Sequence, residues 1–290
     1  MGGAVNIVGC GRTGRALARL FQDAKVFDVT NILTRSLASA SEAADFIGAG
    51  KPLAAMHELA PAPIWMIATP DEVIGDVARQ LVRSNWVRQG DVVFHLSGAL
   101  SSKELVDCQA VGASVASLHP VQNFADPAVS IGQFSGTWCA LEGDSAATQI
   151  LRKAVEAIGG KIITIAPHQK TLYHAGAVMA CNYLVALLDV SLDILRTAGV
   201  NREQGAALLT PILRATVDNV LAQGVDNAMT GPIARGDIDI VERHITELER
   251  LGPESVSVYR ALGRATLAVA ERRKELSSER IDKMKDLLAE

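Results

Sequence analysis

The chain has 290 residues, of which 49% are apolar, 21% charged and 4% aromatic, a composition that excludes general disorder. Its length exceeds the size at which one core usually stops growing, so we expect two domains. The formal net charge of −4 gives no electrostatic reason to expect nucleic acid or an anionic membrane as a partner, and favours a small molecule.

Cysteine spacing and the first residues bear on the cellular compartment. The four cysteines show no C-x-x-C spacing, so we expect free thiols in a reducing compartment and no metal site. No basic and apolar leader precedes the first expected strand, which favours the cytoplasm. The most membrane-like stretch, 175–195, contains two aspartates, which are costly in hydrocarbon. We therefore expect a buried helix of a soluble protein there, not a membrane span.

The secondary-structure signals change along the chain. Up to residue 166, short β-rich runs alternate with helical patterns such as 71–82, as in βαβ units that form a mostly parallel sheet. The expected strands are 5–8, 29–33, 64–68, 92–96, 114–118, 137–141 and 161–165. Beyond Ala166-Pro167 the sequence is helical throughout, so we expect domains 1–166 and 167–290. The expected helices of the second domain are 168–197, 202–223, 238–251, 254–276 and a final amphipathic piece.

A glycine-rich turn follows the first expected strand and opens a helix. In Gly9-x-Gly11-x-x-Gly14, the first glycine permits a tight turn, the second lets a pyrophosphate approach, and the third lets helix and strand pack closely. Arg12 and Thr13 lie inside this loop, where the helix N-terminus favours phosphate. The pattern predicts a Rossmann-type, doubly wound α/β domain with a dinucleotide site, and a structural turn without ligand is the alternative.

The end of the second expected strand bears on the choice of cofactor. An Asp or Glu there would bind the ribose hydroxyls of NAD, but the sequence reads Thr34-Arg35-Ser36. A guanidinium flanked by hydroxyls suits a 2′-phosphate, so we predict NADP. In the alternative, Arg35 is a solvated loop residue and Arg12 serves the phosphate.

Two further segments lie at carboxyl ends of strands, where doubly wound sheets bind ligands. They contain Thr69-Pro70 and Ser97-Gly98, and we expect them to line the nicotinamide ribose. For Thr69 and Ser97, a role as helix cap or turn former is equally open.

Hydride transfer is the chemistry of the cofactor, so the protein must orient the substrate and move one proton. His119 directly follows expected strand 114–118 and is the first candidate, with a structural histidine as the alternative. His174 is the second candidate, with Lys170 one turn earlier on the same helix face as a candidate substrate contact.

Two polar residues of the second domain are also candidates. Asn182 lies in an otherwise apolar helix and either orients the substrate or joins two helices. Arg235, in the segment 230–237, either grips a substrate carboxylate or pairs with Asp237.

Together, these segments resemble a bacterial family of NADP-binding, Rossmann-like oxidoreductases with a family-specific helical C-terminal domain. The matching segments are the glycine loop, 95–100, 118–120, 173–182 and 230–237. The family is similar to pyrroline-5-carboxylate reductase, prephenate dehydrogenase and the β-hydroxyacid dehydrogenases. This likeness implies an all-α C-terminal domain of the 6-phosphogluconate-dehydrogenase-like kind and a homodimer joined through its helices. Some members resemble an alternative ketopantoate reductase.

One departure from the relatives limits what can be carried over. β-Hydroxyacid dehydrogenases and standard ketopantoate reductases have a lysine one turn before the asparagine that Asn182 matches, but Val178 stands there. The His119-Pro120 step instead resembles the loop histidine of prephenate dehydrogenases, which favours an imidazole as proton donor or substrate anchor.

These residues predict an NADPH-dependent reductase of a small carboxylated carbonyl compound, and the family resemblance implies ketopantoate as the best single guess. His119 or His174 would donate the proton, while Asn182 orients the substrate and Arg235 binds its carboxylate. The alternatives are an imine reductase, a prephenate- or arogenate-type dehydrogenase, and a protein that senses NADP(H) without hydride transfer.

Overall fold

The computed structural model describes residues 3–289. Internal contacts divide the chain into two compact units, Met1–Ala180 and Cys181–Glu290. The point of division lies inside one long helix, α7, which spans Lys170–Thr197. Each unit is described separately below.

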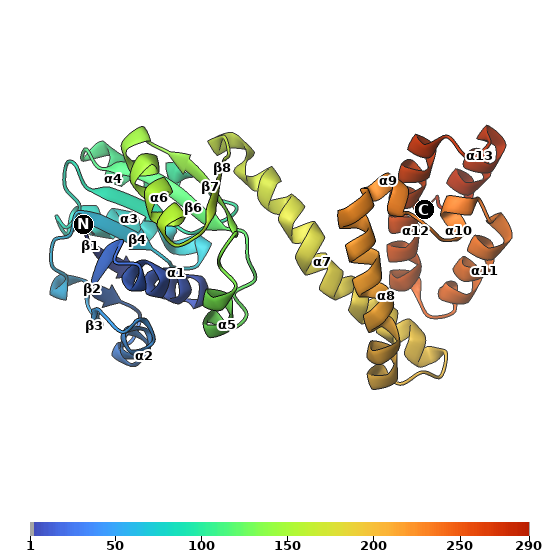
Figure 1. Ribbon diagram of the computed structural model, residues 1–290, viewed down its shortest axis with the longest axis horizontal. Helices are drawn as coiled ribbons and strands as arrows, with labels where there is room; N and C mark the ends of the chain where they lie inside the picture. The colour runs from blue at the N-terminus through green and yellow to red at the C-terminus, as the bar shows by residue number, and fades with distance from the viewer. Residues whose placement is uncertain (1–2, 290) are drawn as a thin grey trace. The chain divides into compact units, whose positions relative to one another are not determined.

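The described part of the first unit contains one eight-stranded sheet in the order β3-β2-β1-β4-β5-β6-β7-β8 (Figure 1). The strands are β1 Gly3–Val8, β2 Phe27–Leu33, β3 Lys51–Leu53, β4 Ile64–Ile67, β5 Val92–His95, β6 Ser114–Pro120, β7 Trp138–Gly143 and β8 Lys161–Thr164. All neighbouring strands are parallel except β6 and β7, which are antiparallel. The expected Rossmann-type, mostly parallel sheet is therefore confirmed.

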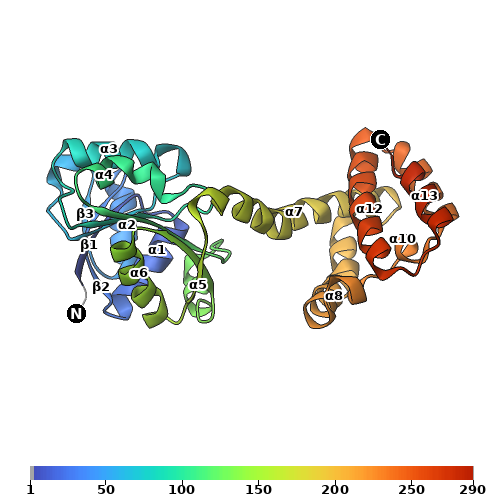
Figure 2. The same cartoon turned by 90° about the horizontal axis from the view of Figure 1, so that it is seen from above.

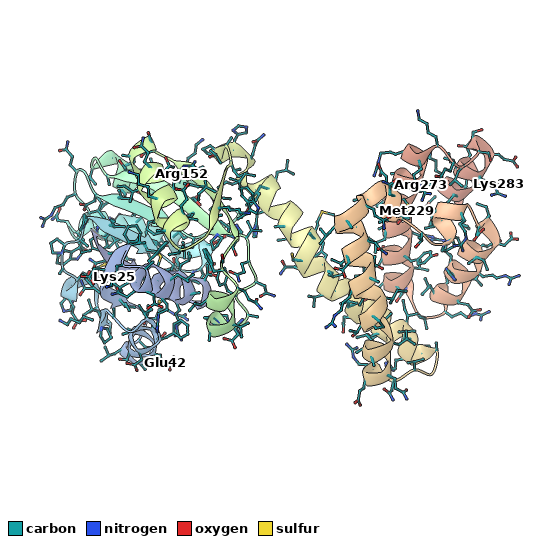
Figure 3. All side chains as sticks on the ribbon, in the orientation of Figure 1. Lys25, Glu42, Arg152, Met229, Arg273 and Lys283 are labelled. Carbon is teal, nitrogen blue, oxygen red and sulfur yellow. The ribbon has the colours of Figure 1, made fainter. Side chains whose placement is uncertain are left out.

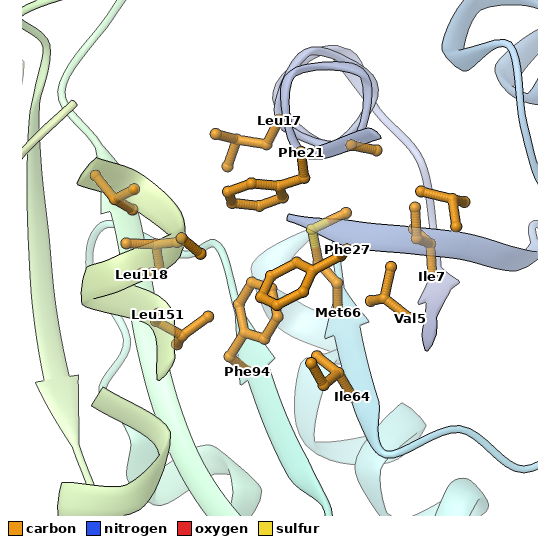
Figure 4. Close-up of a cluster of buried hydrophobic side chains, with 14 of the residues drawn as sticks. Val5, Ile7, Leu17, Phe21, Phe27, Ile64, Met66, Phe94, Leu118 and Leu151 are labelled. Carbon is orange, nitrogen blue, oxygen red and sulfur yellow. The ribbon is translucent and has the colours of Figure 1, made fainter. Parts of the chain in front are cut away.

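Helices cover both faces of this sheet (Figure 2). One face packs against α1 Arg12–Asp23, α2 Leu37–Ile47, α5 Pro127–Gly132 and α6 Ser145–Ala157, and the other against α3 Ile74–Arg83 and α4 Val106–Ala110. Strand β4 is apolar throughout because both of its faces are covered. Ile64 and Met66 pack into the core on the first face, and Trp65 and Ile67 into the core on the other. In the first core, Phe21 of α1 packs edge-on against Phe27 at 5.1 Å (Figure 4).

The short elements differ most from the sequence-based expectation. β3 was not expected, because three residues carry too little periodicity to stand out. The expected helix 71–82 begins as a 3₁₀ turn, Asp71–Val73, before α3 takes over at Ile74. Further 3₁₀ turns are Met56–Glu58, Ser102–Leu105 and Pro167–Gln169.

The described part of the second unit is helical, as expected. Its helices after α7 are α8 Arg202–Gln223, α9 Val225–Ala228, α10 Pro232–Arg235, α11 Ile238–Glu249, α12 Pro253–Arg273 and α13 Ser278–Leu287. A separate core forms where α10, α11, α12 and α13 meet, around Val241 and Met284. Arg273 at the end of α12 donates to the Met229 carbonyl at 2.9 Å and so ties the segment before α10 to this core (Figure 3).

Helix α7 corrects one expectation. The segment Pro167–Thr197 is long and apolar enough, by length and composition, to cross a membrane, and none of its most apolar window is buried within the chain. The expectation of a buried helix is therefore wrong for the single chain, because among the described residues none of that window is buried. Its acidic residues Asp189 and Asp193 both pair with Arg202 of α8.

All four cysteines are free thiols. Cys10, Cys108 and Cys139 are buried, whereas Cys181 on α7 is exposed. Burial raises the pKa of each of the three buried thiols to about 12.

Candidate active site

A cavity of about 1310 Å³ lies at the carboxyl ends of the sheet strands, and its lining residues all belong to the first unit. Both candidate histidines, His119 and His174, line it. So do all of the residues predicted to hold the cofactor, namely Gly9, Gly11, Arg12, Thr13, Gly14, Thr34, Arg35, Ser36, Thr69, Pro70, Ser97 and Gly98. Segments far apart in the sequence therefore meet at one site.

At two positions of the loop a side chain would clash with neighbouring residues, so glycine is required there. At the third position there is open space. Gly9 has φ +75°, and a Cβ there would lie 2.6 Å from Thr69 Cγ2. A Cβ on Gly14 would lie 2.8 Å from Ala68 Cβ, so this glycine lets α1 approach the end of β4. A Cβ on Gly11 would meet nothing within 4 Å. The N-cap residue of α1 is Gly11, which has no side chain to accept from the first N–H groups of the helix and so leaves them for an anion.

The end of β2 carries the residues expected to read the 2′-phosphate. Arg35 and Arg12 are both exposed on the cavity lining. Ser36 caps α2 by accepting a hydrogen bond from Ser39 N at 3.3 Å, and Thr34 Oγ1 donates to the Ser36 carbonyl at 2.7 Å. These bonds fix the turn around Arg35.

The sequence reading missed a third arginine, Arg15, at the same end of the cavity. Arg15 lines the cavity and donates to the Cys10 carbonyl at 3.1 Å. Its place one turn into α1 was the signal, because that turn faces the glycine loop.

The segment after β5 forms a tight, heavily bonded turn. Ser97 Oγ donates to Asp71 Oδ2 at 2.7 Å and accepts from the N–H groups of Ala99 and Leu100 at 3.2 and 2.9 Å. Ser97 thus acts as a turn former, the alternative left open for it, while also lining the cavity. The bond to Asp71 joins residues 26 apart in the sequence, so no local pattern indicates it.

The two histidines meet over Gly98. Their rings lie perpendicular with centroids 5.5 Å apart, and a Cβ on Gly98 would lie 2.8 Å from His119 Nε2 and also meet the His174 ring. His119 Nδ1 and Tyr173 Oη share a hydrogen bond of 3.1 Å. His174 Nδ1 is buried and has no hydrogen-bond partner among residues 3–289. The role of Tyr173 was missed, although its place beside His174 could have indicated it.

Burial and charge set the protonation of this cluster. Burial, with smaller contributions from the nearby Lys170 and His174, lowers the pKa of His119 to about 4. The ring is therefore neutral near pH 7. Burial, with a contribution from Cys139, raises the pKa of Tyr173 to about 12, so its hydroxyl stays protonated.

Lys170 does not lie where substrate contact requires it. Its side chain is 1% exposed, and it is absent from the cavity lining. The amine donates to the Ser97 carbonyl at 2.8 Å and to Ser117 Oγ. The expected direct substrate contact does not fit this placement, because the amine is buried and its bonds go to Ser97 and Ser117.

The remaining candidates belong to the second unit. Asn182 is exposed on α7, and Arg235 is exposed and pairs with Asp237 at 2.9 Å. This ion pair is one of the two roles considered for Arg235. The substrate roles of Asn182 and Arg235 stay predictions.

The fold and the glycine loop define a Rossmann-like domain, and comparison with protein families agrees. Residues 3–120 match the family described as Rossmann-like domain. Residues 137–266 match DUF2520, described as a domain of unknown function. The two matched segments follow one another along the chain, the first over the sheet and the second over its last two strands and most of the helical region. A comparison with curated proteins found no match.

Several solved structures share the fold across most of the chain. A protein from Thermotoga maritima is 29% identical, with TM-score 0.72 over 93% of this chain and 100% of its own. A Bacteroides fragilis protein assigned as an NADP oxidoreductase is 18% identical, with TM-score 0.72 over 92% and 98%. A reductive aminase from Aspergillus terreus in complex with NADPH is 17% identical, with TM-score 0.60 over 99% and 93%. Pyrroline carboxylate reductases and an imine reductase also match.

Proposed function

We propose that the protein is an NADPH-dependent oxidoreductase that reduces a small carboxylated carbonyl compound, with ketopantoate as the best single candidate. One observation carries this proposal. The same cavity is lined by the glycine loop with its arginines and by the paired rings of His119 and His174. A dinucleotide site and a proton-transfer site thus share one space.

The cavity lining fits a nicotinamide dinucleotide phosphate. Gly11 leaves room for a pyrophosphate at the N-terminus of α1. Arg12 and Arg35 present guanidinium groups for a 2′-phosphate. Thr69 Oγ1 and His174 Nδ1 are buried polar atoms that find no partner in the described part of the chain, and a bound ligand would satisfy them.

Hydride transfer alone does not complete the reduction, and residues of the chain would supply the proton. The reduced cofactor supplies a hydride, and reducing a carbonyl to an alcohol also needs one proton at the oxygen. The neutral His119 ring, held at Nδ1 by Tyr173, offers Nε2 beside Gly98 for a hydrogen bond to that oxygen. His174 Nδ1, which lacks a partner, is the second group able to move the proton. Asn182 would orient the substrate and Arg235 would bind its carboxylate.

A cyclic imine is the second candidate substrate, because His119 is neutral near pH 7. A protonated imine brings its own proton, so its reduction requires only the hydride and a site that tolerates the positive charge. The likeness to a reductive aminase supports testing this class.

The cofactor assignment is tested by fluorescence titration with NADPH and NADH. We expect tighter binding of NADPH, and Arg35→Ala should weaken it about 10-fold to 100-fold while leaving NADH unchanged, as expected for one charge-assisted contact. Arg83→Ala removes an exposed arginine elsewhere in the same unit and serves as the control. Tighter binding of NADH, or an Arg35→Ala variant that keeps its NADPH preference, would refute the assignment.

The reaction is tested with a panel of 2-keto acids and cyclic imines, followed by NADPH absorbance. We expect turnover of ketopantoate, and His174→Ala should keep cofactor affinity but lose turnover. Tight NADPH binding with no turnover across the panel would instead support an NADP(H)-sensing protein.

We also propose a cytoplasmic homodimer joined through the C-terminal helices. Large apolar side chains of the second unit are exposed on α7 and α8, including Tyr183, Val185, Ile212 and Leu221. Exposed apolar surface of this kind favours coverage by a partner. The pairing of Asp189 and Asp193 with Arg202 leaves α7 with little unpaired charge to oppose such burial.

A further inference from the structure

A buried lysine lies one helical turn before His174, and the proposed reaction gives it no task. Lys170 is the first residue of α7. It is buried, whereas the other residues of that helix are at least partly exposed. Its ammonium donates to the Ser97 carbonyl at 2.8 Å and to Ser117 Oγ, and Ser117 Oγ donates to the same carbonyl at 3.3 Å. A buried charge of this kind is costly unless its bonds are satisfied.

The next residue of α7 contacts the same turn. Thr171 Oγ1 donates to the Ala99 carbonyl at 3.2 Å. The first turn of α7 therefore holds the turn after β5 at two successive positions, Lys170 to Ser97 and Thr171 to Ala99. Gly98, the residue between those two acceptors, is the one against which both histidine rings lie.

Helix geometry connects this anchor to the site. His174 follows Lys170 by one helical turn on the same face, so the position of the Lys170 end sets where the His174 ring falls. We propose that Lys170 is a positioning residue whose ammonium anchors α7 to the Ser97–Gly98 turn and thereby sets the two histidine rings against each other. Its importance for catalysis rests on the proposed function, but the anchoring does not.

The charges around Lys170 come from several elements. Glu142 of β7, buried and bonded to Ser102 N and Oγ, and Asp71 of the 3₁₀ turn raise the pKa of Lys170. Burial outweighs them and lowers that pKa to about 8, so the amine is charged at neutral pH. Its charge in turn lowers the pKa of His119 and of His95. Removing the charge should therefore be visible at His119.

The experiment is an NMR titration of the histidine rings in the full chain, without cofactor or substrate. In Lys170→Met, we expect the pKa of His119 to rise by about one unit and the His119 and His174 ring signals to shift. Lys170→Arg should restore the low pKa in part. Lys153→Met removes an exposed lysine of α6 and should leave both rings unchanged.

Ser117→Ala keeps the charge but removes one of the two acceptors, and it guards against a Lys170→Met variant that does not fold. It should shift the His174 ring signals and the Gly98 amide while leaving the pKa of His119 low. Unchanged ring signals in Ser117→Ala, or an unchanged His119 pKa in folded Lys170→Met, would overturn the proposal. Absence of NADPH binding by the wild-type chain would refute the proposed function and leave this result standing.

Discussion

His95 illustrates how a single buried ring makes a fold sensitive to acid. Its Nδ1 accepts a hydrogen bond from Ser97 N at 3.2 Å, so its other nitrogen, Nε2, carries the proton and donates to the Ser101 carbonyl at 3.1 Å. If Nδ1 were protonated, its N–H group would face the N–H group of Ser97, and the hydrogen bond between them would be lost. Burial agrees with this bonding and lowers the pKa of His95 to about 4.

The low pKa of His95 predicts acid sensitivity of the first unit. Above pH 6.5 the ring is neutral in both the folded and unfolded states, and as pH falls toward 4 only the unfolded state gains the proton. The free energy of unfolding should therefore drop by ~3 kcal/mol over this window on account of His95. His95→Gln offers a donor and an acceptor but does not titrate, and should flatten this part of the profile. Urea unfolding at several pH values measures it, and parallel profiles for both proteins would contradict the argument.

At the scale of elements, two glycines of the loop between β1 and α1 have different roles, one in helix packing and one in ligand access. Gly14 lets α1 pack on Ala68, whereas Gly11 borders open space in the cavity. The first task concerns stability and the second concerns ligand access. Substitution can separate them, because Gly11 has φ −69°, which alanine adopts freely.

We predict opposite outcomes for Gly14→Ala and Gly11→Ala. Gly14→Ala should destabilise the fold by about 1–3 kcal/mol, because its Cβ would force α1 away from Ala68. Gly11→Ala should unfold at the wild-type temperature but bind NADPH at least 10-fold more weakly, because the methyl group occupies the pyrophosphate approach. Thermal unfolding and cofactor titration of both variants test this. Equal loss of stability in the two would contradict it.

Local elements were predictable from sequence, whereas long-range side-chain contacts were not. The glycine loop, most strands and α8 follow from patterns within a few residues. The Tyr173–His119 bond joins residues 54 apart, and the Lys170–Ser97 bond joins residues 73 apart. Sequence spacing put Lys170 and His174 one turn apart on one helix, but it could not indicate that Lys170 would bond to the Ser97 carbonyl while the His174 ring lies against Gly98.

At the scale of the whole molecule, burial within one chain does not account for the sequence of α7. Its composition predicts a covered helix, yet side chains such as Val185 are 69% exposed in the single chain. The sequence argument failed here because hydrophobicity indicates that a face is covered without indicating by which molecule. A second copy is the occupant we propose.

The homodimer predicts a mass in solution of twice the chain mass. Val185→Asp on α7 and Ile212→Asp on α8 should each shift the protein toward monomer, because each would bury a charge at the interface. Ile240→Asp, at an exposed position of α11, is the matched control and should stay dimeric. Sedimentation equilibrium measures the mass. A monomeric wild type, or one that partitions into lipid vesicles, would contradict the dimer.

The distribution of the cysteines gives the molecule an internal chemical probe. Three thiols are buried with their pKa raised to about 12, so a thiolate-selective reagent should react first at Cys181, which is exposed on α7 beside Asn182. A maleimide dye would thus label the native chain at one known position without mutagenesis. The labelling rate would report how well α7 is shielded, and it should fall as protein concentration rises and copies associate. Association and any substrate-linked change near Asn182 become measurable at one sulfur atom.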